Sequence, residues 1–330
     1  MAVPTILGVF GVAFPTAIFN ADADAKQLQQ FRVEGLSNEV YGTVYTGGAL
    51  EDGGMPLGGV GTGYLCVDTD GRFGKASIFN RYPAPMVIGQ PFLSVKIGER
   101  EYVVAMPKDG VGDAKAVHYF GHFPIADVRF EFDAPFSVEL RAFSPFIPGA
   151  SAESNTPAAL FEVFLTNLSS EPLTAAVVFS TRGFPQGEAE SFSSGDWAGV
   201  QVAHSPVEKL PDWVKHTYAV AAEKGQVEPS DQGARVSVSR GLAANERGAF
   251  QFVLGWHQPY LRDGSGRVEK HMYAERFDCA RAVALHATAQ RESWLKHVLA
   301  WQDALYGTDL PGWLKETLVN APYALTKNSL

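Results

Sequence analysis

Short segments in which apolar and polar residues alternate dominate residues 31 to about 256, and they limit the fold more than any other feature of the sequence. Alternation with a period of two gives a strand one apolar and one polar face. Gly, Pro, Asn and Ser separate the segments at fairly even intervals, as turns between strands require. We therefore predict a mainly β fold with a large antiparallel β-sandwich. The clearest strands are expected at residues 92–97, 128–132, 138–143, 159–166, 173–180, 236–238 and 248–256.

The periodicity changes towards the end of the chain. From about residue 268 to residue 306 apolar residues recur in steps of three and four, which predicts a long amphipathic helix. Gly307 is placed to end this helix. We expect Asp309 to cap a second helix that has Pro311 in its first turn and runs towards Leu325.

Tryptophans mark the apolar face of these two helices. Trp294, Trp301 and Trp313 lie at helical spacing, and we expect all three in the core. A helix pair with a bare apolar face must pack on the sandwich or on sequence that this chain does not contain. The chain ends at Leu330 without a stop signal, so we expect it to be truncated and to expose part of this face.

Composition excludes several classes of protein. A chain of 330 residues can form one large domain or two smaller ones. Its net charge of −9 comes without a basic cluster, which argues against nucleic acid and anionic membrane surfaces as partners. Cys66 and Cys279 lie too far apart in sequence for a metal motif, so we expect two unpaired thiols.

Residues 1–30 form a leader or a possible export signal. The stretch 3–19 is almost entirely apolar, and residues 21–25 carry Ala-x-Ala spacing, but no Lys or Arg precedes Lys26. An atypical export signal, an ordinary N-terminal strand and a misassigned start therefore all stay open, and so does the compartment. No other apolar run approaches the roughly 20 residues that span a bilayer, so we expect a soluble protein that is not transmembrane.

The glycine-rich stretch at residues 55–65 could be taken for a nucleotide-binding loop. Such a loop needs a helix directly after the glycines, with the pyrophosphate at its N-terminus. Here a short β-rich run and an Asp70-Gly71 turn follow instead, and no Gly-Lys-Ser/Thr is present. The glycines therefore indicate tight turns or close backbone approach, either at a domain contact or beside a ligand.

Two clusters combine aromatic and planar polar side chains, as carbohydrate sites do. The first is Trp-His-Gln-Pro-Tyr-Leu-Arg at residues 256–262, in a predicted loop, and the second is Asn-Arg-Tyr-Pro at residues 80–83. We favour a role in sealing the sandwich against a helical domain, with sugar binding as the alternative. No metal is expected at His118 and His122, because they have no helical context and no nearby Glu. The Asp-Thr-Asp-Gly at residues 68–71 is interpreted as a hairpin turn, not a calcium loop.

Several blocks in order resemble glycoside hydrolase family 116, which contains bacterial β-glucosidases and the non-lysosomal glucosylceramidase (bile-acid β-glucosidase). Met-Pro-Leu-Gly-Gly-Val-Gly-Thr-Gly at residues 55–63 resembles that family's glycine signature, and Ser-Pro-Phe-Ile-Pro-Gly at 144–149 its Pro-Phe-Ile-Pro segment. Asp-Gly-Arg-Phe-Gly at 70–74 is similar to the strand pair between them. The tail blocks at 272–277, 301–306 and 310–314 match most clearly.

The resemblance implies an N-terminal β-sandwich followed by an (α/α)₆ barrel that holds the nucleophile and the acid/base carboxylate. We then expect a leader at 1–30, the sandwich at 31–265, a linking helix at 266–307 and the start of a truncated barrel at 308–330. Since no residue here matches the catalytic pair, we expect no catalytic residue, metal or cofactor in this chain. The implied partners are the chain's own C-terminal helical barrel and a β-glucoside or glycolipid substrate.

Three functional hypotheses follow. The first is the N-terminal part of a retaining β-glucosidase or glucosylceramidase-like enzyme, inactive by itself. The second is a stand-alone, non-catalytic carbohydrate-binding or scaffolding sandwich, and the third is an enzyme complete within this chain, for which the sequence offers no carboxyl pair. Candidates for the substrate rim or the domain interface are Gly58, Gly59, Gly61, Thr62, Arg81, Trp256, His257, Tyr260 and Arg262.

Overall fold

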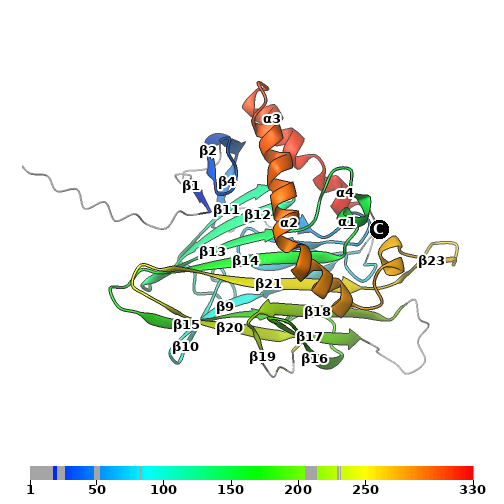
Figure 1. Cartoon of the computed structure of the whole chain (residues 1–330), viewed down its shortest axis with the longest axis horizontal. Helices are drawn as coiled ribbons and strands as arrows, with labels where there is room; N and C mark the ends of the chain where they lie inside the picture. The colour runs from blue at the N-terminus through cyan, green and yellow to red at the C-terminus, as the bar shows by residue number, and fades with distance from the viewer. Residues whose placement is uncertain are drawn as a thin grey trace, which may run out of the picture.

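The computed structural model describes residues 18–20, 27–47, 53–81, 84–204, 214–228, 230 and 232–329. Antiparallel strands dominate these residues, and the long helix and its successors follow them in the C-terminal part (Figure 1). The predicted mainly β fold, a sandwich followed by a helix, is confirmed. In the described part of the chain no helix is both long and apolar enough to cross a membrane. Most of the predicted leader lies outside the described residues.

A nine-stranded antiparallel sheet, the large sheet, is the centre of the fold. Its strands are, in spatial order, β16 (Glu188–Ser194), β17 (Trp197–His204), β18 (His216–Glu223), β21 (Arg247–His257), β14 (Ala158–Asn167), β13 (Phe136–Phe143), β12 (Ile125–Glu131), β11 (Ala116–His122) and β4 (Val44–Thr46). All predicted strands that fall in this sheet are present, and β14 and β21 extend slightly beyond the predicted ends.

The described residues form four smaller sheets as well. The small sheet has the order β10 (Arg100–Val103), β9 (Leu93–Ile97), β15 (Leu173–Ser180), β20 (Arg235–Leu242) and β19 (Gln226–Val227). The rim sheet comprises β5 (Met55–Leu57), β6 (Leu65–Val67), β7 (Arg72–Ala76) and β8 (Met86–Pro91). The N-terminal sheet comprises β1 (Phe19–Asn20), β2 (Gln29–Val33) and β3 (Val40–Gly42), and a last hairpin pairs β22 (Tyr260–Arg262) with β23 (Val268–Lys270).

The main core lies between the large sheet, the small sheet and the rim sheet. Alternate residues of β14 and β21, such as Phe161 and Phe252, point into it and are buried. Phe179 of the small sheet packs on both, with ring centroids at 4.9 and 5.6 Å. Phe73 of the rim sheet stacks on Phe92 at 4.0 Å. The period-two pattern of the sequence is therefore the direct cause of the layered core.

Helix α2 (Ala280–Tyr306) lies across the other, outer face of the large sheet (Figure 1). It approaches β21 so closely that a Cβ at Gly255 would lie 3.0 Å from the backbone nitrogen of Ala284. The predicted helix start near residue 268 was wrong. That region forms β23 and the 3₁₀ turn η2 (Met272–Glu275), because the Gly-Ser-Gly turn at 264–266 pairs β23 with β22.

Two short helices follow α2 in the described residues, α3 (Gly312–Asn320) and α4 (Tyr323–Lys327). Asp309 does not cap α3 as predicted; Pro311 occupies that position in an extended conformation, and no side chain caps the helix. Trp294 is buried and Trp301 half-buried, but Trp313 is 61% exposed, so its predicted place in the core was wrong. Helix α3 buries Val319 instead, against the N-terminal strands.

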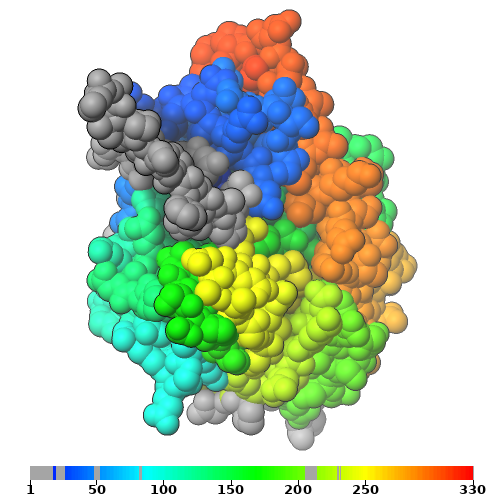
Figure 2. Space-filling model, turned by 60° about the vertical axis from the view of Figure 1, so that its left-hand side comes forward, coloured from blue at the N-terminus to red at the C-terminus, as the bar shows by residue number. Residues whose placement is uncertain are grey.

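The N-terminal strands and the C-terminal helices meet at one end of the molecule (Figure 2). The carboxylate of Asp303 in α2 accepts hydrogen bonds from the backbone nitrogens of Ser37 and Asn38 at 3.0 and 2.8 Å. Segments more than 260 residues apart in the sequence are thereby held together.

Candidate substrate rim and domain contact

The glycine loop, residues 58–63, connects β5 to β6 at one edge of the sandwich. Gly58 has a φ of 143°, and a Cβ there would lie 2.4 Å from the carbonyl oxygen of Gly63. At Gly59 a Cβ would lie 2.5 Å from the carbonyl oxygen of Thr156. The glycines therefore serve close backbone approach, one of the two roles that the sequence predicted.

Trp256 supports the glycine loop from the protein interior. Its indole Nε1 donates a hydrogen bond to the carbonyl oxygen of Thr62 at 2.7 Å. The Thr62 hydroxyl in turn donates to the carbonyl oxygen of Gly59 at 2.8 Å. Because the Trp256 side chain is 1% exposed, it offers no open aromatic face on which a sugar ring could stack.

A second loop, residues 144–156, holds the glycine loop from the side. The backbone nitrogen of Val60 donates to the carbonyl oxygen of Ser154 at 2.7 Å, and Nδ2 of Asn155 donates to the carbonyl oxygen of Val60 at 2.6 Å. Arg276 donates to the Thr156 hydroxyl at 2.9 Å. The carboxylate of Glu153, in helix α1 (Ser151–Ser154), accepts from the indole of Trp294 in α2 at 2.9 Å.

The C-terminal end of the described chain contacts the glycine loop as well. The backbone nitrogen of Gly61 donates to the Ser329 hydroxyl at 2.8 Å, and the Thr326 hydroxyl donates to the carbonyl oxygen of Gly58 at 3.4 Å. The glycine loop is thus fixed between the sandwich and the helices that follow it.

The other candidate residues form a second group, beside the end of β21. Nδ2 of Asn80 donates to the carbonyl oxygen of Tyr260 at 2.7 Å, so its Oδ1 is the acceptor for Nε2 of His271 at 3.0 Å. His257 is buried, and its Nε2 contacts the carbonyl oxygen of Phe277 at 2.9 Å. Burial lowers the pKa of both His257 and His271, which keeps these imidazoles neutral at neutral pH.

Exposure separates the remaining candidates. Arg81 and Arg262 are exposed, and Tyr260 is half-buried on strand β22, not in a loop as predicted. Tyr82 and Pro83 of the predicted second cluster lie outside the described residues. None of the candidate residues is a carboxylate, so they can position or bind a ligand but supply neither nucleophile nor general acid for glycoside cleavage.

The two groups are continuous along the edge. The backbone nitrogen of Tyr64 donates to the Ser77 hydroxyl at 3.0 Å, and the backbone nitrogen of Ser77 donates to the carbonyl oxygen of Tyr64 at 2.9 Å. Residues 77–80 therefore connect the glycine loop to Tyr260 and His271. Sequence reasoning missed Ser154, Asn155, His271 and Ser329, because their contacts join segments far apart in the chain; the Asn155-Thr156-Pro157 turn was the one local signal.

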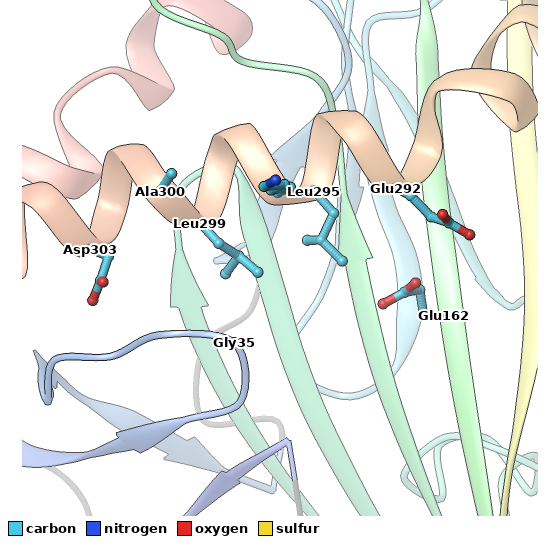
Figure 3. A pocket seen from close by; sticks show the side chains of 8 residues that line it. Gly35, Glu162, Glu292, Leu295, Leu299, Ala300 and Asp303 are labelled. Carbon is cyan, nitrogen blue, oxygen red and sulfur yellow. The ribbon is translucent and has the colours of Figure 1, made fainter.

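A separate pocket of about 440 Å³ lies between α2 and the outer face of the large sheet (Figure 3). Glu162 of β14 and Glu292 of α2 both line it, and Leu295 and Leu299 form its apolar side. Burial raises the pKa of the Glu162 carboxyl, an effect that the nearby Arg141 partly offsets.

Comparison with known proteins identifies the family. The family model for the N-terminal region of glycosyl-hydrolase family 116, described as beta-glucosidase 2, matches residues 54–232. Among solved structures, a protein described as a kojibiose phosphorylase from human microbiome is 8% identical, with a TM-score of 0.40 over 87% of this chain and 36% of its own. A polysaccharide lyase is 13% identical, with a TM-score of 0.27 over 62% of this chain and 32% of its own.

The chain thus spans about a third of the length of these two structures. The family model includes the glycine loop and the loop at residues 144–156, which are the two segments that form the core of the candidate site. Because the match extends over more than half of the chain, the chain belongs to glycosyl-hydrolase family 116 and carries the N-terminal region of that family.

Proposed function

We propose that this chain is the N-terminal β-sandwich part of a retaining β-glycosidase that acts on β-glucosides or glycolipids. The catalytic carboxylates then belong to a helical barrel that follows it. Membership of family 116 supports the glycosidase class, and the family model itself describes an N-terminal region.

The observation that carries the proposal is an apolar surface on α3, α4 and the turn before them. Large apolar side chains that are at least 38% exposed gather on these elements: Leu310, Trp313, Leu318, Tyr323 and Leu325. Other residues of the same elements, Val319, Asn320 and Thr326, pack against or hydrogen-bond to the sandwich. An apolar surface on helices fixed in this way fits a further helical domain that packs against it.

In this proposal residues 31–265 are the sandwich, 266–307 link it to the barrel, and 308–330 begin the barrel. The glycine loop then lies where sandwich and barrel meet, since it already contacts Ser329 and Thr326. A retaining mechanism needs two carboxyl groups about 5–5.5 Å apart across the anomeric carbon. We expect the barrel to supply both, so the 330-residue chain by itself should be inactive.

The test compares the natural gene product, isolated from its source cells, with the purified 330-residue chain. Intact mass and hydrolysis of 4-nitrophenyl β-glucoside are measured for both. We expect the natural gene product to have a mass above 35.7 kDa and to hydrolyse the substrate, whereas the 330-residue chain should not hydrolyse it. Turnover by this chain alone would overturn the proposal. A natural gene product of 35.7 kDa that binds oligosaccharides without cleaving them would support the stand-alone carbohydrate-binding sandwich instead.

A further inference from the structure

A pocket of about 340 Å³ lies directly beside the glycine loop. Side chains and backbone from three separate segments form it: the glycine loop, the loop at 144–156 and the 3₁₀ turn η2. The lining residues are Val60, Phe146, Ile147, Pro148, Gly149, Ser151, Ser154, Asn155 and Met272.

The walls of this pocket are apolar and largely fixed. Phe146 packs edge-on against Phe123 and Trp301, with ring centroids at 5.1 and 5.2 Å. The backbone of Ile147 is held at both its nitrogen and its oxygen by the Ser154 hydroxyl, at 2.8 and 3.1 Å. A wall that is ordered beforehand costs a ligand little conformational entropy.

Met272 completes the pocket from the other side. It lies on η2 and is 57% exposed, so a ligand can reach its side chain from solvent. Its unbranched thioether side chain can adapt to ligands of different shape. The pocket therefore combines a rigid wall with an adaptable one.

The polar capacity of the pocket is small. No charged side chain among the described residues lines it, and the Ser154 hydroxyl already forms hydrogen bonds with the backbone of Ile147. Asn155 is 6% exposed, and its Nδ2 donates a hydrogen bond to the carbonyl oxygen of Val60. Its Oδ1 has no hydrogen-bond partner among the described residues. A sugar ring carries several hydroxyls, and each one buried without a partner costs about 1–3 kcal/mol. The pocket thus suits an apolar group and not the sugar itself.

We propose that this pocket binds an alkyl or aryl group, as the aglycone of a glycoside, with the sugar lying outside it. The role of the pocket as an aglycone site rests on the proposed function. The binding of an apolar group to the pocket does not depend on that function. Hydrophobic transfer from water supplies the affinity, so binding should strengthen with each added methylene until the pocket is full.

The first test measures binding to the 330-residue chain by NMR of ¹³C-methyl-labelled methionine. The chain has five methionines, so the Met272 signal can be assigned with a Met272→Leu variant. Hexyl β-glucoside and phenyl β-glucoside should shift the Met272 signal and bind at least tenfold more tightly than methyl β-glucoside. Glucose alone should leave the signal unchanged. Equal effects of glucose and hexyl β-glucoside, or no effect of any probe on Met272, would overturn the inference.

Variants locate the binding. Met272→Asp places a charge at the pocket and should weaken hexyl β-glucoside binding at least tenfold, whereas Met272→Leu should retain it. Val87→Asp changes a more exposed apolar residue on β8 that does not line this pocket, and it serves as the control. Equal loss in Met272→Asp and Val87→Asp would contradict a site at this pocket.

A second measurement separates the inference from the proposed function. In the natural gene product, Met272→Asp should raise KM for hexyl β-glucoside more than it raises KM for methyl β-glucoside. If KM depended neither on the aglycone nor on the Met272→Asp substitution, the pocket assignment would be overturned and the glycosidase proposal would stand. Pocket binding without any hydrolysis would support the pocket and overturn the glycosidase proposal.

Discussion

The two faces of the large sheet are both buried, but by different means. The inner face is apolar throughout its central strands, as Phe161, Val163 and Phe252 illustrate. The outer face, under α2 and the N-terminal sheet, buries charged groups. Arg141 and Asp127 on neighbouring strands form a bidentate ion pair, in which Nε and Nη2 donate to the two carboxylate oxygens at 2.8 and 2.9 Å. Both residues are almost completely buried.

The partners of the outer face come from distant segments. Glu139 accepts from the backbone nitrogen of Ile18 at 3.2 Å, and Gln302 of α2 contacts Nδ1 of His122 at 3.1 Å. Nε2 of His122 contacts Asp127 at 3.1 Å. The inner face gains its stability from area removed from water, which tolerates many arrangements. The outer face requires particular partners, so it specifies where the N-terminal strands and α2 dock.

The largest effect is expected on the inner face. Phe161→Ala should reduce the free energy of unfolding by about 3–5 kcal/mol, because it removes a buried ring and leaves a cavity. Urea denaturation at pH 7 and pH 5 measures the loss, which should be the same at both values. Phe192→Ala, which truncates a half-buried ring on edge strand β16, is the matched control and should cost clearly less. A loss that varies strongly with pH would contradict an apolar inner face.

A loss of about 3 kcal/mol at neutral pH is expected for Arg141→Met, because the buried Asp127 then loses its guanidinium partner and keeps only His122. Burial by itself raises the pKa of the Asp127 carboxyl, but Arg141 and His122 more than offset this and hold it below its usual value. The wild-type contribution is therefore present above the unfolded pKa of about 3.9 and is lost as pH falls through the lower folded pKa. Urea denaturation from pH 3 to pH 7 measures this dependence.

In the variant Asp127, without its guanidinium partner, should take up a proton more readily, so the loss of stability relative to wild type should shrink as pH falls. The double variant Asp127→Leu/Arg141→Met should recover much of the stability. Arg240→Met breaks an exposed ion pair with Glu246 at 3.6 Å and should change stability by less than about 1 kcal/mol. If Arg141→Met cost no more than Arg240→Met, the contrast between the faces would fail.

The smallest effect is expected at Glu162, which lies on the outer face in the pocket of Figure 3. Burial raises the pKa of this carboxyl above its unfolded value of about 4.3, so ionisation costs the folded state more than the unfolded state. Its contribution to stability is full below the unfolded pKa and is lost as pH rises through the folded pKa. Glu162→Gln should therefore stabilise the chain at pH 7 by less than about 1 kcal/mol and have no effect near pH 3.

Glu292→Gln removes an exposed carboxylate from the same pocket and is the matched control for Glu162→Gln. Because Glu292 is exposed, we expect this variant to change the free energy of unfolding by less than about 0.5 kcal/mol. Thermal denaturation at pH 3, 5 and 7 compares the two variants. A destabilised Glu162→Gln variant at pH 7 would show that the ionised carboxylate is needed on this face.

The prediction from sequence succeeded where the signal is local. Strand β15 was predicted with its observed bounds, and the Asp-Gly turn between β6 and β7 has the expected hairpin hydrogen bonds. The helix start failed because the turn at 264–266 separates a hairpin strand from the helix. The predicted burial of Trp313 was wrong, because helical spacing identifies an apolar face but not the segment that covers it.

The candidate site was predicted only in part. The glycine loop and Trp256 were both named, but nothing in the sequence showed that the Trp256 indole donates to Thr62. Arg81 and Arg262 proved exposed, and Asn155 and His271, which hold neighbouring segments in place, were missed.

The sequence by itself determined the layered β architecture, the turns and the need for glycine at residue 58, because alternation and backbone freedom act over a few residues. Only the tertiary structure decided that Asp127 faces Arg141, that Gln302 meets His122, and that Ser329 contacts Gly61. These contacts depend on which distant segments pack together, and the free energy of that packing belongs to the whole chain and to no local pattern within it.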